Sequence, residues 1–355
     1  MKFIHTGDHH LGLSLKSASF AKSDAYKKRM QEVQSAFFDL CEIVKTSPTD
    51  FMVLTGDLFD HARVKISLIE EVFYTLNRLN KPIYITIGNH DTFLHNAAFE
   101  NIRQLENIHF FSSEQFKYTY KNVDIYGMNT KDYNEDKLTE IITNIDPNQK
   151  NILCLHGDIF NAKDDHYLSS KAFLKKLPFD YIALGHIHKH EFIDKHIAYS
   201  GNLEPFDFSE TEVKGYILGD LSEPTFTFIP FSKRRFVIKK ITLTSEDTIQ
   251  TIKQKIFEAT TKKERDNDFI RVILEGRINR SLHLNDDAFL LIQDDYYYIE
   301  FKNQTKYDLD LEALKKAYKD TIIEYLIDSY HETESDEESL VLAIDALLET
   351  EETSR

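Results

Sequence analysis

The chain has 355 residues, 41% of them hydrophobic, and a formal net charge of -16 at pH 7. This length accommodates one large core and a smaller second domain, and no stretch approaches the run of ~20 apolar residues that a membrane helix needs. The N-terminus lacks the apolar segment of a secretory signal, so we expect a cytoplasmic protein. Cys41 and Cys154 each lie in an apolar run, which predicts buried free thiols.

The negative charge is unfavourable for a protein that binds nucleic acid, because phosphates repel acidic surfaces. Residues 236–355 carry more of this excess than residues 1–235, although they are the smaller part of the chain. Bound divalent cations would also neutralise carboxylates at a metal site. The charge therefore weakens the case for nucleic-acid binding without excluding it.

Five segments share one pattern, in which a short apolar run ends in a cluster of Asp, Asn or His. They are residues 3–10, 51–57, 83–91, 152–158 and 181–188. Such runs predict strands that are buried on both faces, and helical patterns lie between them at 24–45 and 66–79. Alternating strands and helices predict a layered α/β core, in which the polar clusters meet at the carboxyl ends of the strands.

The pattern changes in the second half of the chain. Residues 197–200, 215–221 and 225–231 predict short strands that form a second sheet. Beyond the basic run Lys233-Arg234-Arg235, strands at 236–243, 269–274 and 296–302 and a helix at 245–260 predict a small α+β domain. Two amphipathic helices should follow from residue 309. We therefore expect three parts, at 1–235, 236–304 and 305–355.

The polar clusters supply the ligands of a two-metal site. Such a site needs a carboxylate shared by both ions, with imidazole and oxygen ligands on each side. Asp8 and His10 lie two residues apart in an extended segment, so their side chains point the same way. Asp57 follows a glycine turn, where its carboxylate is placed to bridge the ions. The candidate metal ligands are Asp8, His10, Asp57, Asn89, His156, His186 and His188.

These residues resemble, in the same order, the five signature motifs of the calcineurin-like metallophosphoesterase superfamily. The motifs are Asp8-x-His10, Gly56-Asp57-x-x-Asp60, Gly88-Asn89-His90-Asp91, His156 and Gly185-His186-x-His188. Further stretches are similar to the SbcD nuclease branch of that superfamily, and this likeness covers residues 1–235. They are Leu11-Gly12, Leu58-Phe59-Asp60, Tyr199-Ser200-Gly201-Asn202, Phe208 and Lys214-Gly215.

The resemblance implies a fold, a cofactor and partners. The fold is a four-layer αββα sandwich, followed by an α+β cap domain that binds DNA and by C-terminal helices that dock a partner. Two divalent ions, most commonly Mn²⁺, are implied, one held by Asp8, His10, Asp57 and His188 and the other by Asp57, Asn89, His156 and His186. The implied activity is DNA exonuclease and endonuclease, in a complex with an SbcC-like coiled-coil ATPase. The nuclease subunit is expected as a homodimer within a heterotetramer or larger assembly.

The chemistry assigns a role to the residue after Asn89. A water activated by two cations attacks phosphorus, and the departing sugar oxygen then needs a proton. His90 is not required as a ligand, so we expect it to act as general acid or charge stabiliser, with Asp91 orienting its ring. A purely structural role for His90 is the alternative.

One position departs from the pattern of some relatives, which carry a His three residues after the bridging Asp. This chain has Asp60 there, and His61 follows it. His61 either substitutes for the missing imidazole or serves as a helix cap or surface residue.

Two other functions remain open on the sequence alone. A phosphatase or small cyclic-nucleotide phosphodiesterase would use the same core, but it would not need the residues after Arg235. A non-catalytic scaffold is disfavoured by the complete ligand set. The apolar stripes of the last two helices either pack on each other or dock the coiled coil of the partner. A role in repair, replication or defence against foreign DNA is not distinguished.

Overall fold

The computed structural model describes residues 1–13, 24–61, 63–279, 282, 284, 289–308, 311–333 and 337–352. The chain divides into two compact units, Met1–Phe236 and Val237–Arg355. Among the described residues, no helix combines the length and the apolar character needed to cross a bilayer. Cys41 and Cys154 are buried free thiols, as predicted.

The first unit is built on two six-stranded mixed sheets, with strand orders β12-β11-β1-β2-β3-β4 and β5-β6-β7-β8-β10-β9. The strands of the first sheet are β1 (Lys2–Thr6), β2 (Phe51–Thr55), β3 (Ile83–Thr86), β4 (Ile108–Phe110), β11 (Gly215–Asp220) and β12 (Thr225–Pro230). Those of the second are β5 (Lys117–Tyr120), β6 (Val123–Met128), β7 (Lys150–His156), β8 (Tyr181–Gly185), β9 (Glu191–Asp194) and β10 (Ile197–Tyr199). The α/β class is therefore confirmed.

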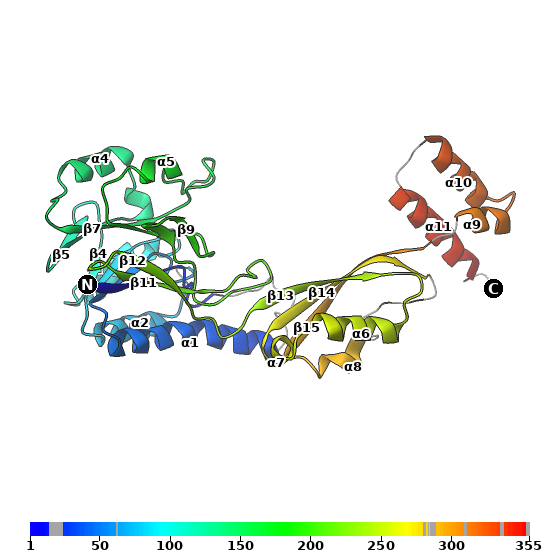
Figure 1. The fold of residues 1–355 in the computed structure, drawn as a ribbon, viewed down its shortest axis with the longest axis horizontal. Coiled ribbons are helices and arrows are strands. Elements are labelled where there is room, and N and C mark those ends of the chain that lie inside the picture. The colour runs from blue at the N-terminus through cyan, green and yellow to red at the C-terminus, as the bar shows by residue number, and fades with distance from the viewer. Residues whose placement is uncertain are drawn as a thin grey trace. The chain divides into compact units, whose positions relative to one another are not determined.

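The two sheets face each other, and helices cover their outer faces. Buried residues of both sheets, such as Phe3 and Val53 from one and Ile152 and Tyr181 from the other, form a common core between them. Helices α1 (Asp24–Thr46) and α2 (Ile66–Asn77) pack on the outer face of the first sheet. Helices α4 (Glu135–Thr143) and α5 (Lys171–Leu174) pack on the second, opposite α1 and α2 in Figure 1. A short helix, α3 (Glu100–Arg103), precedes β4.

The prediction that residues 197–231 form a separate sheet is wrong. β10 pairs in parallel with β8 of the second sheet, and β11 pairs antiparallel with β1 of the first, with β12 beside it. The backbone groups of β1 on that side thereby gain partners, which an exposed sheet edge would lack. These strands thus complete the two existing sheets, so the five strands that carry polar clusters lie inside them.

The second unit contains a three-stranded sheet in the order β13-β14-β15. Its elements are β13 (Phe236–Leu243), α6 (Ile249–Ala259), α7 (Lys262–Asn267), β14 (Phe269–Ile278), α8 (Leu290–Gln293) and β15 (Tyr298–Tyr307). Ile252 and Ile256 of α6 pack on one face of the sheet, against Ile270 and Val272. β15 extends to Tyr307, past residue 304 where we expected this part to end.

The described residues of the C-terminal segment form three helices where we expected two. They are α9 (Leu311–Ala317), α10 (Ile322–Thr333) and α11 (Glu337–Glu352), and residues 309–310 lie outside the described part. The expected first helix is interrupted at Asp320, whose φ of 61° is incompatible with a right-handed helix. Ile323 and Ile327 of α10 pack against Leu340 and Ile344 of α11. The helices therefore bury one apolar stripe between themselves.

Candidate metal centre

The polar clusters meet at the carboxyl ends of β1, β2 and β3 from one sheet and β7 and β8 from the other. Main-chain hydrogen bonds tie the loops together: the Asp8 N–H donates to the Gly56 carbonyl at 3.0 Å, and the His10 N–H donates to the Asp57 carbonyl at 3.0 Å. Across the two sheets, the His186 N–H donates to Asp8 Oδ1 at 2.9 Å. The loops of both sheets thus form one connected site.

Several of these residues adopt left-handed backbone conformations, which are costly for residues with a side chain. The φ values are 54° for Asp8, 44° for His10, 49° for Asp57 and 101° for His186. Such strain clusters at functional sites, where the surrounding structure imposes it. Gly56, at φ 83°, has no side chain because a Cβ there would lie 2.4 Å from His156 Nδ1. The strained backbone costs local stability, and it allows the candidate ligands to approach one another closely.

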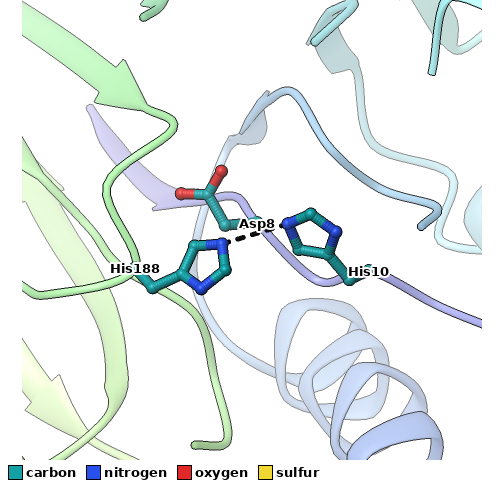
Figure 2. Close-up of side chains that lie close together, drawn as sticks. All are labelled: Asp8, His10 and His188. Carbon is teal, nitrogen blue, oxygen red and sulfur yellow. Dashed lines mark hydrogen bonds between the residues drawn. The ribbon is translucent and has the colours of Figure 1, made fainter. Parts of the chain in front are cut away.

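The first group of candidate ligands consists of Asp8, His10 and His188. The Nε2 atoms of His10 and His188 face each other at 3.1 Å, and Figure 2 shows the Asp8 carboxylate beside them. Asp8 is fully buried, and its Oδ2 atom has no hydrogen-bond partner among the described residues. An unpartnered buried carboxylate oxygen is costly, so this geometry fits a cation between the three side chains.

The second group consists of Asp57, His156 and His186. His156 Nδ1 donates to the Thr55 carbonyl at 2.7 Å, which leaves Nε2 as the lone-pair atom. That Nε2 lies 3.0 Å from Asn89 Oδ1 and 3.3 Å from Asp57 Oδ2. Three electron-pair donors that converge in this way repel one another unless a proton or cation lies between them.

Asp57 lies between the two groups. Its Oδ2 atom is 3.7 Å from His10 Nε2 and 3.3 Å from His156 Nε2, and its Oδ1 accepts a hydrogen bond from the His90 N–H at 2.9 Å. The structure thus brings all seven expected ligands together, with Asp57 at the position expected for a shared carboxylate. The His and Asp clusters are consistent with a dinuclear metal site, and their mixed imidazole and oxygen donors suit divalent ions.

Electrostatics within the site follow from this crowding. Burial disfavours the charged form of His156, but the adjacent Asp57 carboxylate outweighs burial and raises the pKa of His156 to about 9. Burial disfavours ionisation of Asp57 as well, yet the neighbouring His156 charge lowers the pKa of Asp57. Burial, followed by the charge of His156, lowers the pKa of His186 and so favours the neutral imidazole that binds metals.

His90 lies at the exposed rim of the site, beside a third cluster formed by His10, Asp60 and His90. Its ring centroid is 4.7 Å from that of His10, and its Nδ1 contacts the Asp60 carbonyl. Donation to that carbonyl leaves Nε2 available to hold a proton. The Asp60 carboxylate lies 3.4 Å from His10 Nδ1, and His61, which follows it, is 44% exposed.

Asp91 does not orient the His90 ring in this structure. Its buried carboxylate accepts hydrogen bonds from the main-chain N–H groups of Leu58 and Phe59, each at 2.8 Å. Burial and the nearby Asp57 carboxylate raise the pKa of Asp91 to about 7. Asp91 therefore holds the backbone that follows Asp57. The His90 ring, which we expected Asp91 to orient, contacts the Asp60 carbonyl instead.

Two neighbours of the ligands were missed by sequence reasoning. Glu210 Oε1 lies 2.6 Å from His188 Nδ1, and the ring of His166 lies 5.5 Å from that of His186. Burial opposes ionisation of Glu210, but the hydrogen bond from His188 and the charge of Lys214 hold its pKa at about 2. Neither residue follows an apolar run, so nothing local in the sequence marks them.

This chain is similar to one protein family and to several distantly related proteins. The uncharacterized metallophosphoesterase YhaO of Bacillus subtilis is 27% identical over 243 residues, which cover 62% of this chain and 59% of YhaO. The match thus spans less than two thirds of that relative. Two solved chains also match. One is 12% identical, with a TM-score of 0.40, and the match covers 65% of this chain and 99% of that chain. The other is the NAD nucleotidase NadN of Haemophilus influenzae, which is 14% identical, with a TM-score of 0.36, over 76% of this chain and 57% of NadN.

The family model of the calcineurin-like phosphoesterases matches residues 1–190, which is more than half of the chain and includes all the candidate ligands. The mixed sheets of the first unit are consistent with that family's fold. This chain belongs to the calcineurin-like phosphoesterase family.

Proposed function

We propose that this protein is a metal-dependent nuclease that hydrolyses phosphodiester bonds of DNA, with Mn²⁺ as its activating ion. The observation that carries the proposal is the position of Asp57, whose Oδ2 is within 3.7 Å of His10 Nε2 and 3.3 Å of His156 Nε2. A carboxylate in this position would hold two ions side by side, an arrangement typical of phosphatases and nucleases. The choice of DNA rests on the likeness of residues 1–235 to SbcD nucleases.

When bound, the two cations supply positive charge for the transition state and lower the pKa of a coordinated water. The protein's own residues fix the geometry around them. The Thr55 carbonyl fixes the tautomer of His156, and the Asp91 carboxylate fixes the loop that carries Asp57. We assign to His90, which lies at the exposed rim and keeps Nε2 free of the Asp60 carbonyl contact, the donation of a proton to the leaving sugar oxygen.

The second unit supports a polymeric substrate over a small one. One face of its sheet is covered by α6, and the register of β14 and β15 places alternate residues on the other face. That face carries Arg271, Arg277, Lys302 and Lys306 together with Glu275 and Glu300. Arg277, Lys302 and Lys306 on this face are suited to phosphate contacts, whereas Arg271 is mostly buried and pairs with Glu300 at 2.5 Å. The overall charge of -16 predicts weak binding at high salt.

We further propose that the C-terminal helices dock a coiled-coil ATPase, which would place the nuclease in a larger assembly as a homodimer. Ile322 and Tyr325 of α10 and Leu342 of α11 are 60%, 72% and 66% exposed. Apolar side chains of this size on a helix surface are typical of protein contacts. The stripe buried between α10 and α11 is separate from these three residues.

The substrate is tested by comparing two esters with one preparation of the full chain. We expect Mn²⁺-dependent shortening of end-labelled single-stranded DNA, slow turnover of a nitrophenyl phosphate monoester, and no reaction in EDTA. Rapid monoester turnover with intact DNA would instead identify a phosphatase. Metal binding without hydrolysis of either ester would identify a non-catalytic scaffold.

A further inference from the structure

We propose that Glu210 is a positioning residue that sets the tautomer and orientation of His188 toward the metal site formed with Asp8 and His10. The inference rests on the two-metal centre of the proposed function and names a residue outside the five motifs. Glu210 lies in the segment between β10 and β11, and its Oε1 is 2.6 Å from His188 Nδ1. Its side chain is only 12% exposed.

The contact determines which ring nitrogen of His188 can bind a metal. An ionised carboxylate only accepts hydrogen bonds, so Nδ1 of His188 must carry the proton that it donates to Glu210. Nε2 is then the lone-pair atom, and it points to His10 Nε2 at 3.1 Å. Carboxylate partners of this kind fix ring orientation and raise ligand basicity in metal sites.

Glu210 is itself held rigidly. Its Oε2 accepts hydrogen bonds from the Asn202 side chain at 3.0 Å and from the Phe206 N–H at 3.1 Å, and it lies 3.2 Å from Lys214 Nζ. The Lys214 side chain is fully buried. A carboxylate with this many fixed partners has little freedom to rotate, so it transmits a defined orientation to His188.

The same segment fixes the main chain of His188. Lys214 Nζ and the Asn202 N–H both donate to the His188 carbonyl, at 2.8 and 3.2 Å. Gly201, which precedes Asn202, has a φ of 68°, and a Cβ at this position would lie 2.5 Å from the His188 carbonyl oxygen, so a residue with a side chain would not fit here. The ring of Phe206 packs edge-on against His188, with centroids 5.3 Å apart. Backbone, ring plane and tautomer of His188 are thus set by five residues of this segment, Gly201, Asn202, Phe206, Glu210 and Lys214.

The contact between Glu210 and His188 affects the metal site of Asp8, His10 and His188 more than the site of Asp57, His156 and His186. His188 belongs to the group with Asp8 and His10, whereas His156 in the second group takes its orientation from the Thr55 carbonyl. Loss of the Glu210 carboxylate should therefore weaken binding of one ion and leave the other nearly unchanged.

The test is a calorimetric titration of the metal-free full chain with Mn²⁺ alone, for the wild type, Glu210→Gln and Glu212→Gln. Glu212 is a matched control because it accepts from the same Lys214 amine at 2.7 Å, and no hydrogen bond among the described residues joins it to His188. We expect two binding events in the wild type and in Glu212→Gln. In Glu210→Gln one event should weaken roughly 10- to 100-fold, while the other event keeps its wild-type affinity.

Each outcome has a distinct meaning. If the wild type binds two ions and Glu210→Gln binds both with wild-type affinity, the role of Glu210 is wrong and the proposed function stands. If the wild type binds no pair of ions, the two-metal centre itself is wrong, and the role of Glu210 with it. Should Glu210→Gln fail to fold, imidazole nitrogen NMR of the Zn²⁺-bound wild type decides: a hydrogen-bonded proton on Nδ1 of His188 supports the proposal, and its absence overturns it.

Discussion

Asp57 Oδ2 lies 3.3 Å from Nε2 of His156, a residue that comes from the opposite sheet of the sandwich. Both side chains are buried. In the metal-free protein the charged forms of the two groups attract each other, which raises the pKa of His156 and lowers that of Asp57. Metal binding must displace the proton of His156, so folding, protonation and metal binding are linked at this pair.

The first prediction is that stability of the metal-free protein falls at alkaline pH. The pKa of His156 is raised from 6.5 to about 9. The contribution of this group is therefore fully present below pH 6.5 and is lost as pH rises through 9, which corresponds to roughly 3 kcal/mol. Urea denaturation in EDTA should show the difference between wild type and His156→Gln shrinking over that range. A difference that stays constant with pH would contradict the ion pair.

The second prediction concerns proton donation at the rim. His90→Asn should keep both metals but lower the rate on DNA by about 100-fold, because the sugar oxygen is a poor leaving group without a proton. The loss should be much smaller on a nitrophenyl ester, whose leaving group needs no proton. Single-turnover rates and metal analysis of the same preparations provide the measurement. A variant that loses metal would show that His90 is a ligand.

The third prediction is that Asp91 contributes to stability and that its neighbour His90 does not. Asp91→Ala removes the acceptor for two buried main-chain N–H groups, of Leu58 and Phe59. Such a loss should lower the free energy of unfolding by about 1–3 kcal/mol, whereas His90→Asn, at an exposed position, should leave it unchanged. Denaturant unfolding of the two variants in EDTA checks this. Equal stabilities would show that Asp91 does not hold that loop.

The fourth prediction concerns the partner. Deleting residues 309–355, which begins after β15 ends at Tyr307, should abolish co-purification with a co-expressed coiled-coil ATPase and spare Mn²⁺-dependent cutting of single-stranded DNA. Tyr325→Glu should have the same effect through one exposed side chain, with Lys316→Glu on α9 as the control. Retention of the ATPase by the truncated chain would place the dock elsewhere.

The candidate ligands could be predicted from the sequence because each one lies at the end of an apolar strand or within four residues after it, and parallel strands bring such ends together. Contacts between distant segments could not be predicted in this way. Asp91 binds the backbone 33 and 32 residues away, and Glu210 binds His188 across 22 residues. The antiparallel strand β11 likewise joins β1 from the far end of the unit. Local patterns carry no information about these pairings, because they depend on how the sheets close.

The most direct test of the two-metal centre is an anomalous diffraction map from crystals of the full chain grown with Mn²⁺. We expect two peaks, about 3.5–4 Å apart, with the Asp57 carboxylate contacting both and the Asp8, His10 and His188 side chains around one of them. In Asp57→Ala, the pair should be disrupted and hydrolysis lost. A single peak in the wild type, or two bound ions with normal turnover in Asp57→Ala, would contradict the account.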